Sequence, residues 1–316
     1  MNISVEYKDT HGIISNQTHR MSRLAFAKHL AIAGQGYAPA PRKLLRTIAM
    51  FLHYSYYTRS GAFNNDRFSE PPVALSDPTE KGQFSNLAGK AIADFLSKRI
   101  DRSFFTVNYE AAMRLNRIPL SIAGRQVKRP DLLAFTANST FAIEAKGFSG
   151  WYGNMAYHKA QSQSGGIPVN YTIASVSYDL YNNVKCKYHD PFNDNVSFDN
   201  ELFSGLTRNY YQGLSLFLNE KFFYFREVEF QGEQFYEIEL SNRIFFQFFK
   251  RDSPFSPFWH HEILDYYRPT LILPRDIMAY AEKGISSNIQ PFLFDTIEQS
   301  SNIYIDNDRV GLSFRR

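Results

Sequence analysis

RPDLLAF (residues 129–135) and TFAIEAKG (residues 140–147) are two apolar runs of strand length with turn-prone residues between them. This pattern predicts two adjacent antiparallel strands. Because side chains alternate along a strand, Glu144 and Lys146 should point to one face and Ala145 to the other. The turn-back should bring Asp131, at the start of the first strand, beside them. The sequence therefore predicts two carboxylates and one amine at one place.

The chemistry open to such a place is limited. Asp131 and Glu144, together with the carbonyl oxygen of Ala145, suit a hard cation such as Mg²⁺ better than Zn²⁺. Lys146 could orient an attacking water or neutralise charge that grows on a phosphate. The pattern favours metal-assisted hydrolysis of a phosphodiester. The alternative is an edge hairpin with a solvated Glu–Lys pair, in which Asp131 is an ordinary turn residue.

Pro130-Asp131, followed after a strand and a turn by Glu144-Ala145-Lys146, resembles the signature of the PD-(D/E)xK nuclease superfamily. That superfamily includes many restriction endonucleases and repair nucleases. The resemblance covers about residues 78–190 and rests on a short, degenerate motif. It implies an α/β fold with a restriction-endonuclease-like core, in which helices flank a central mixed sheet. It also implies Mg²⁺ as cofactor, with Mn²⁺ able to substitute, and DNA as substrate.

The resembled family often takes a third metal-binding carboxylate from a helix before the sheet. A helix is predicted from about Asp77 to Leu96, and Glu80 in its first turn is the candidate for catalysis and metal binding. The alternative is that Glu80 only stabilises the helix dipole. Glu110 lies in a strand predicted over residues 104–115 and could fill the same role. The sequence does not choose between them, and Asp94 is a weaker candidate because exposed helix faces commonly carry acids.

A helix is also predicted over residues 154–164, directly after the Glu144–Lys146 strand. In the resembled family a Gln or Lys on this helix can support the active site, so Gln161 and Lys159 are candidates. His158 is less favoured as a general base, since a metal can itself activate water. Trp151 and Tyr152 lie where a base could pack, although aromatic residues at such positions more often belong to the core.

Composition narrows the class of protein. Of the 316 residues 44% are hydrophobic and 21% charged, which is typical of a soluble globular protein. No apolar run approaches the roughly 20 residues that span a bilayer, and the N-terminus does not resemble a signal peptide, so we expect no membrane association and a cytoplasmic location. The single cysteine, Cys186, excludes an intramolecular disulfide and a cysteine-cluster zinc site. No P-loop, GxGxxG or GxSxG motif is present, so no nucleotide cofactor is expected.

The chain divides by composition into three predicted regions. Residues 1–70 should be a basic helical N-terminal region, with helices near 21–33 and 41–52 after a polar start. Residues 71–216 should form the nuclease core, and residues 217–316 an acidic, aromatic-rich C-terminal extension that begins with a hairpin. Lys and Arg number 9 against 4 Asp and Glu in the first region, 15 against 12 in the second and 11 against 15 in the last. The basic N-terminal side is therefore the better candidate to approach a phosphate backbone.

Together these patterns predict a metal-dependent endodeoxyribonuclease of the restriction or genome-defence type. A homodimer would suit cleavage of both strands at a palindromic site. Two alternatives remain open: a catalytically inactive nucleic-acid-binding or assembly protein on the same fold, and a nuclease that acts on RNA or branched DNA.

Overall fold

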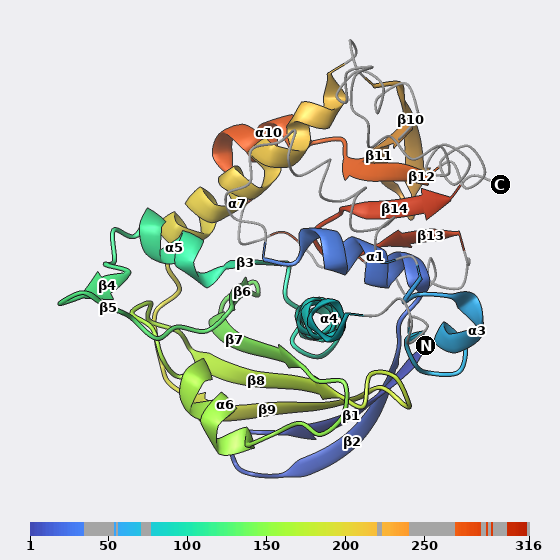
Figure 1. Cartoon of the computed structure of the whole chain (residues 1–316). Helices are drawn as coiled ribbons and strands as arrows, with labels where there is room; N and C mark the ends of the chain where they lie inside the picture. The colour runs from blue at the N-terminus through green and yellow to red at the C-terminus, as the bar shows by residue number, and fades with distance from the viewer. Residues whose placement is uncertain are drawn as a thin grey trace.

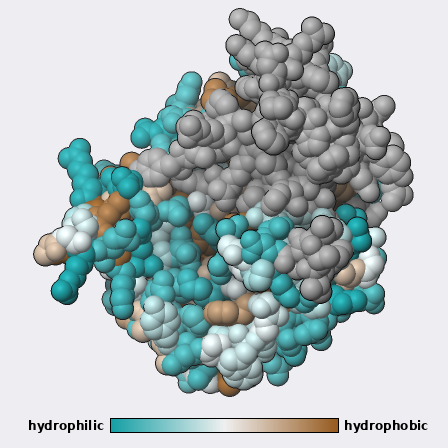
Figure 2. All heavy atoms as spheres, in the orientation of Figure 1, coloured by the Kyte–Doolittle hydropathy of each residue, from teal (hydrophilic) through white to brown (hydrophobic). Residues whose placement is uncertain are grey.

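The computed structural model describes residues 1–34, 54, 56–70, 77–219, 223–239, 269–285, 289, 292 and 302–314. The helix predicted near residues 41–52 lies outside these ranges. Within them, no helix is long and apolar enough to cross a membrane. The surface that faces the viewer in Figure 2 is mainly hydrophilic over the described residues, with apolar side chains in small separate groups.

A seven-stranded mixed sheet occupies the lower part of the view in Figure 1. Its strands are β1 (Asn2–Lys8), β2 (Ile14–Arg20), β3 (Phe105–Asn108), β6 (Leu132–Phe135), β7 (Thr140–Gly147), β8 (Tyr171–Tyr178) and β9 (Lys185–Asn193). They are ordered β2-β1-β9-β8-β7-β6-β3. The pairs β1–β9 and β7–β8 are parallel and the other neighbours are antiparallel. The prediction of an α/β fold with a central mixed sheet flanked by helices is thus confirmed.

The first twenty residues belong to this sheet, so the prediction of a helical N-terminal region is wrong for them. β1 buries Ile3 and Val5 and leaves the residues between them exposed, which is the alternation of a half-buried strand. It pairs with β9 on one side and with β2 on the other. The predicted helix near 21–33 is confirmed as α1 (Arg23–Ile32). Ser22 caps its N-terminus, where the hydroxyl accepts a hydrogen bond from the Ala25 amide.

The segment after β3 also differs from the prediction. The strand expected over residues 104–115 ends at Asn108, where helix α5 (Tyr109–Leu115) begins. The Asn108 side chain accepts a hydrogen bond from the Ala111 amide and so caps the helix. Glu110 therefore lies in the first turn of a helix and not on the outer face of a strand.

Two helices cover opposite faces of the sheet (Figure 1). They are α4 (Pro78–Ile100) and α6 (Met155–Ser162), both close to their predicted bounds. Glycines let α4 approach β7 closely: a methyl group at Gly147 would lie 1.8 Å from the Ser85 carbonyl oxygen, and one at Gly89 2.4 Å from the backbone of Lys146. Helix α4 therefore packs on the face to which Gly147 points. Glu144 and Lys146 point away from it, because side chains alternate along β7.

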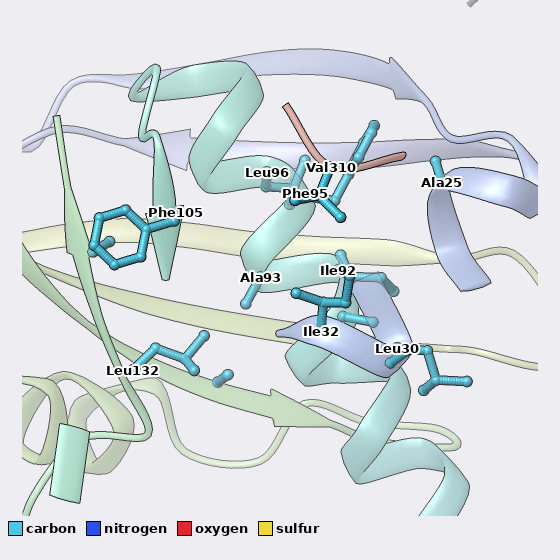
Figure 3. Packing of buried hydrophobic residues seen from close by; sticks show 14 of the residues in the cluster. Ala25, Leu30, Ile32, Ile92, Ala93, Phe95, Leu96, Phe105, Leu132 and Val310 are labelled. Carbon is cyan, nitrogen blue, oxygen red and sulfur yellow. The ribbon is translucent and has the colours of Figure 1, made fainter. Parts of the chain in front are cut away.

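The hydrophobic core lies between α4, α1 and the sheet. Figure 3 shows Phe95 and Leu96 of α4 beside Val310 from the C-terminal part of the chain, and Ile92 of α4 beside Ile32 of α1. All five side chains are buried. Residues that lie more than two hundred positions apart thus share one core.

A second, five-stranded antiparallel sheet packs beyond α1 (Figure 1). Its strands are β10 (Phe225–Phe230), β11 (Glu233–Glu239), β12 (Pro269–Pro274), β13 (Ile303–Ile305) and β14 (Gly311–Phe314), in the order β10-β11-β12-β14-β13. The hairpin predicted at the start of the C-terminal region is confirmed as β10–β11. The remaining described elements are α3 (Ser60–Phe63), β4 (Ser121–Ile122), β5 (Arg125–Gln126), α7 (Asn200–Ser215), a 3₁₀ turn at Leu216–Leu218 and α10 (Ile277–Lys283).

A buried ionic network joins this second sheet to the core. Asp306 and Asp308, in the turn between β13 and β14, both accept hydrogen bonds from Lys28 of α1 and Lys98 of α4 at 2.6–3.1 Å. Tyr210 of α7 donates to Asp308 at 2.7 Å. All five side chains are almost fully buried. Each charge therefore has its partners inside the protein, and removal of one carboxylate leaves two buried lysines with a single carboxylate between them.

We expect Asp308→Ala to lower the free energy of unfolding by about 3–5 kcal/mol, because Lys28 and Lys98 would keep their buried charges without this partner. The matched control is Glu70→Ala, which removes a solvent-exposed ion pair with Lys81 and should cost at most about 1 kcal/mol. Urea unfolding followed by circular dichroism measures both. Equal, small losses in the two variants would contradict the role given to the network.

Candidate active site

The β6–β7 hairpin brings Asp131 beside the end of β7, as the sequence predicts. Leu132 pairs with Ile143, and the Asp131 amide donates a hydrogen bond to the Ile143 carbonyl at 3.1 Å. The Asp131 carboxylate turns toward β7, where Oδ2 accepts a hydrogen bond from the Ala145 amide at 3.0 Å. In an extended strand the amide and carbonyl of one residue point the same way, so the Ala145 carbonyl also faces the Asp131 side.

Lys146 lies between the two carboxylates. Its Nζ is 2.5 Å from Glu144 Oε1 and 3.4 Å from Asp131 Oδ2. Burial lowers the pKa of the Lys146 ammonium, but Asp131 and Glu144 outweigh this effect and raise the pKa above its ordinary value. Lys146 is therefore a fixed positive charge at the meeting point of Asp131 and Glu144.

Glu144 is the deepest member of the group. Its side chain has no exposed surface, whereas Asp131 and Lys146 are part-exposed. Apart from the Lys146 ion pair, no described residue donates a well-aligned hydrogen bond to either Glu144 oxygen. Burial, and next the negative charge of Asp131, raise the pKa of Glu144 to about 8, although Lys146 opposes the shift. The site thus holds a buried carboxyl group that lacks part of the positive charge its ionised form needs.

This donor set fits a hard divalent cation. A buried carboxylate with unfilled acceptor positions, next to a second, part-exposed carboxylate, is chemically suited to Mg²⁺ or Mn²⁺. In the described part of the chain no three His, Cys, Asp or Glu residues come together as a metal-binding group. The protein would therefore supply Asp131, Glu144 and the Ala145 carbonyl, and the remaining ligands would be water or substrate oxygens, as is common for Mg²⁺.

The two candidate upstream acids lie in different places. Glu80 is in the first turn of α4, where it accepts a hydrogen bond from the Tyr57 hydroxyl at 3.3 Å. Because α4 packs on the opposite face of β7 from Glu144, the structure does not bring Glu80 to the carboxylate pair. Glu110 lies in the first turn of α5, and the neighbouring Tyr109 amide donates a hydrogen bond to the Asp131 carbonyl at 3.1 Å. Glu110 is therefore the acid that the structure places beside Asp131.

Glu110 and Asp131 line one open hollow of about 360 Å³. Its other lining residues are Asn108, Gln126, Val127, Lys128, Arg129 and Pro130. Arg129 binds Glu110 through Nη2 at 2.5 Å, and Arg114 binds the other Glu110 oxygen at 2.7 Å. These two cations lower the pKa of Glu110, with the Arg114 hydrogen bond the largest cause. The hollow thus carries positive charge directly beside the exposed carboxylate of the pair.

Helix α6 covers the face of the sheet on which Glu144 and Lys146 lie. His158 of α6 is buried, and burial and then the Lys146 charge lower its pKa, so the neutral ring is favoured. Gln161 is half-buried one turn further along α6, and its backbone carbonyl accepts a hydrogen bond from the Ser164 hydroxyl. Gln161 lies on the helix predicted for it, α6. Among the described residues, no contact links its side chain to Asp131, Glu144 or Lys146.

The surroundings of two charged residues, Arg129 and Asp94, were not predicted. Arg129, the first residue of the RPDLLAF stretch, is the partner of Glu110, and no sequence pattern links the two. Asp94, treated as an exposed helix acid, is instead buried and bonded to His29 at 2.7 Å and Thr106 at 2.9 Å. Only the apolar residues around Asp94 on α4 could have indicated this, since both partners are distant in sequence.

Neither the scan against protein-family models nor the searches of curated proteins and solved structures gave a match for this chain. What can be said of its chemistry therefore depends on the geometry described above.

The raised pKa of Glu144 predicts a pH-dependent stability. Between its ordinary value of 4.5 and about 8 the folded protein holds a proton at Glu144 that the unfolded chain has lost, so the free energy of unfolding falls as pH rises through this range. Glu144→Gln replaces this group with one that does not titrate, so the variant lacks this contribution to the pH dependence of stability. In metal-free buffer we expect the variant to gain on the order of 2–4 kcal/mol relative to the natural protein between pH 5 and pH 8.5. Urea unfolding at a series of pH values measures the free energy of unfolding of both proteins. If the difference between the two proteins stayed the same from pH 5 to pH 8.5, the prediction would be contradicted.

Proposed function

We propose that this protein is a metal-dependent endonuclease that hydrolyses phosphodiester bonds of DNA. The observation that carries the proposal is the position of Lys146 Nζ, within 3.4 Å of both the exposed carboxylate of Asp131 and the buried carboxylate of Glu144. A structural ion pair needs one acid, and a second, buried acid with unfilled acceptor positions adds cost without adding stability. A cation and a phosphate supply the missing partners.

Each residue then has a definite task. Asp131, Glu144 and the Ala145 carbonyl would hold the cation, which when bound would polarise the phosphate and favour ionisation of water. The Lys146 ammonium would orient the attacking water and offset the negative charge that grows on the phosphate oxygens. Glu144 would have to lose its proton to hold a cation, because only the ionised carboxylate is a metal ligand.

Surrounding charge supports a polyanionic substrate. Lys128 and Arg129 line the hollow beside Asp131, and their positive charge would offset the repulsion between phosphate and the two carboxylates. We include Glu110 as a positioning residue that holds Arg114 and Arg129 in place. Cleavage of both strands of a duplex needs two such sites, so a homodimer is part of this proposal.

Mutation of Lys146 gives the direct test. With Mg²⁺ or Mn²⁺ the natural protein should nick and linearise plasmid DNA, and EDTA should stop it. Lys146→Ala should reduce the rate about 10²–10³-fold, because the positive charge acts on the transition state. The matched control is Lys81→Ala, which removes a lysine whose partner is the exposed Glu70 and should leave the rate unchanged.

Two results would count against the proposal. One is cleavage that survives in Lys146→Ala at the natural rate, which would indicate a contaminating nuclease. The other is folded protein that cuts no DNA, RNA or branched substrate with either metal, which would favour a binding or assembly protein on this fold.

A further inference from the structure

The face of the sheet that carries Glu144 and Lys146 continues across β8 and β9 to β1. Strand register aligns Lys146 with Val176, Val176 with Lys187, and Lys187 with Glu6. Their side chains all point to the α6 side, because residues paired across neighbouring strands share a face. Adjacent strands lie about 4.8 Å apart, so Lys187 is about 10 Å from Lys146 along this face. Val176 between them is fully buried, so Lys146 and Lys187 lie on the same side of the sheet with covered surface directly between them.

Three aromatic rings lie side by side on this face. The loop after β7 crosses the end of β8 and is fixed there by hydrogen bonds from Phe148 N to Ser177 O and from Asp179 N to Gly150 O, both at 2.9 Å. It sets the ring of Trp151 4.1 Å from that of Tyr152, which in turn lies 5.0 Å from the ring of Tyr178.

Trp151 is the outermost of these rings. Its side chain is 72% exposed, so the expectation that it belongs to the core is wrong. A large apolar ring held on a fixed loop and left in water is suited to stack on a flat partner such as a nucleic-acid base. Each base has such a face available only when it is not paired and stacked within a duplex.

Positive charge gathers beside the rings. Lys187 lies over the Tyr152 ring at 4.7 Å and bonds Glu6 through both carboxylate oxygens at 2.8 Å. Lys8 and Lys159 lie near the same Glu6. Burial, and next the charge of Lys8, lower the pKa of Lys159, with Lys187 acting in the same direction and Glu6 against it. Glu6 bonds Lys187 and His189, and Lys8 and Lys159 add two further positive charges nearby that an anion would balance.

We infer that this surface binds an unpaired segment of nucleic acid that flanks the bond to be cut. We call it the stacking track and define it by Lys8, Trp151, Tyr152, Lys159, Tyr178 and Lys187. The inference rests on the proposed nuclease function for its substrate and narrows that substrate to DNA with a single-stranded or opened region. The rings would hold base faces, and the lysines would contact the phosphates.

Binding without metal tests the track separately from catalysis. In EDTA, fluorescein-labelled oligothymidylate is titrated with the natural protein, and fluorescence anisotropy gives the dissociation constant. Trp151→Ala should weaken binding roughly 5- to 100-fold, the effect of losing one base stack, while Trp151→Phe keeps most of it. A blunt duplex of the same length should respond less than about 2-fold to Trp151→Ala, since its bases are already stacked.

Two control variants match the track variants in exposure and charge. Tyr224→Ala removes a ring that is 68% exposed but lies outside the track, and it should leave binding unchanged. Lys187→Ala should reduce the slope of log affinity against log salt by about 0.7, the effect of one phosphate contact on a single strand, whereas Lys283→Ala on α10 should not.

The outcomes separate the track from the nuclease. The track would be overturned if Trp151→Ala weakened binding equally on single strand and duplex, or only as much as Tyr224→Ala does. Failure of the natural protein to bind the single strand would also overturn it. Selective loss supports the track even if plasmid cleavage fails. Plasmid cleavage without selective loss leaves the nuclease in place and removes the track.

Discussion

One buried carboxyl group, Glu144, constrains the chemistry of this protein. Burial and the nearby charge of Asp131 make its ionised form unfavourable, and Lys146 offsets only part of that cost. The hairpin keeps the three groups together because the backbone amide of Ala145 holds the Asp131 carboxylate in place. A divalent cation would resolve the imbalance, since it supplies the charge that one lysine cannot. The account of function follows from this carboxyl group, whose ionised form needs more positive charge than Lys146 supplies.

The rest of the fold packs closely against that hairpin. Helix α4 can lie against the end of β7 only because Gly89 and Gly147 have no side chains. The same helix is fixed from its other side by Lys98, which bonds Asp306 and Asp308. Asp306 and Asp308 of the C-terminal part thus contact the helix that packs behind β7. Helix α6 closes the opposite face and carries the neutral His158 close to Lys146.

Local pattern was enough to predict the hairpin and its three side chains, because a period of two fixes which residues share a face. It was also enough for α4 and α6, whose apolar spacing and caps are local features. It failed where partners are distant. Polar residues in β1 and β2 hid the pairing of β1 with β9, and the cap formed by Asn108 ended β3 earlier than the apolar run suggested. The burial of Asp94 depends on His29, sixty-five positions away.

Proton release on metal binding tests the central claim most directly. At pH 7 calorimetric titration of Mn²⁺ in two buffers of different ionisation enthalpy should show one bound ion and roughly one proton released, because Glu144 with a pKa of about 8 must ionise to bind it. Glu144→Gln should release none and bind at least about 10-fold more weakly. Binding by the natural protein without proton release, or equal binding by the variant, would contradict the account.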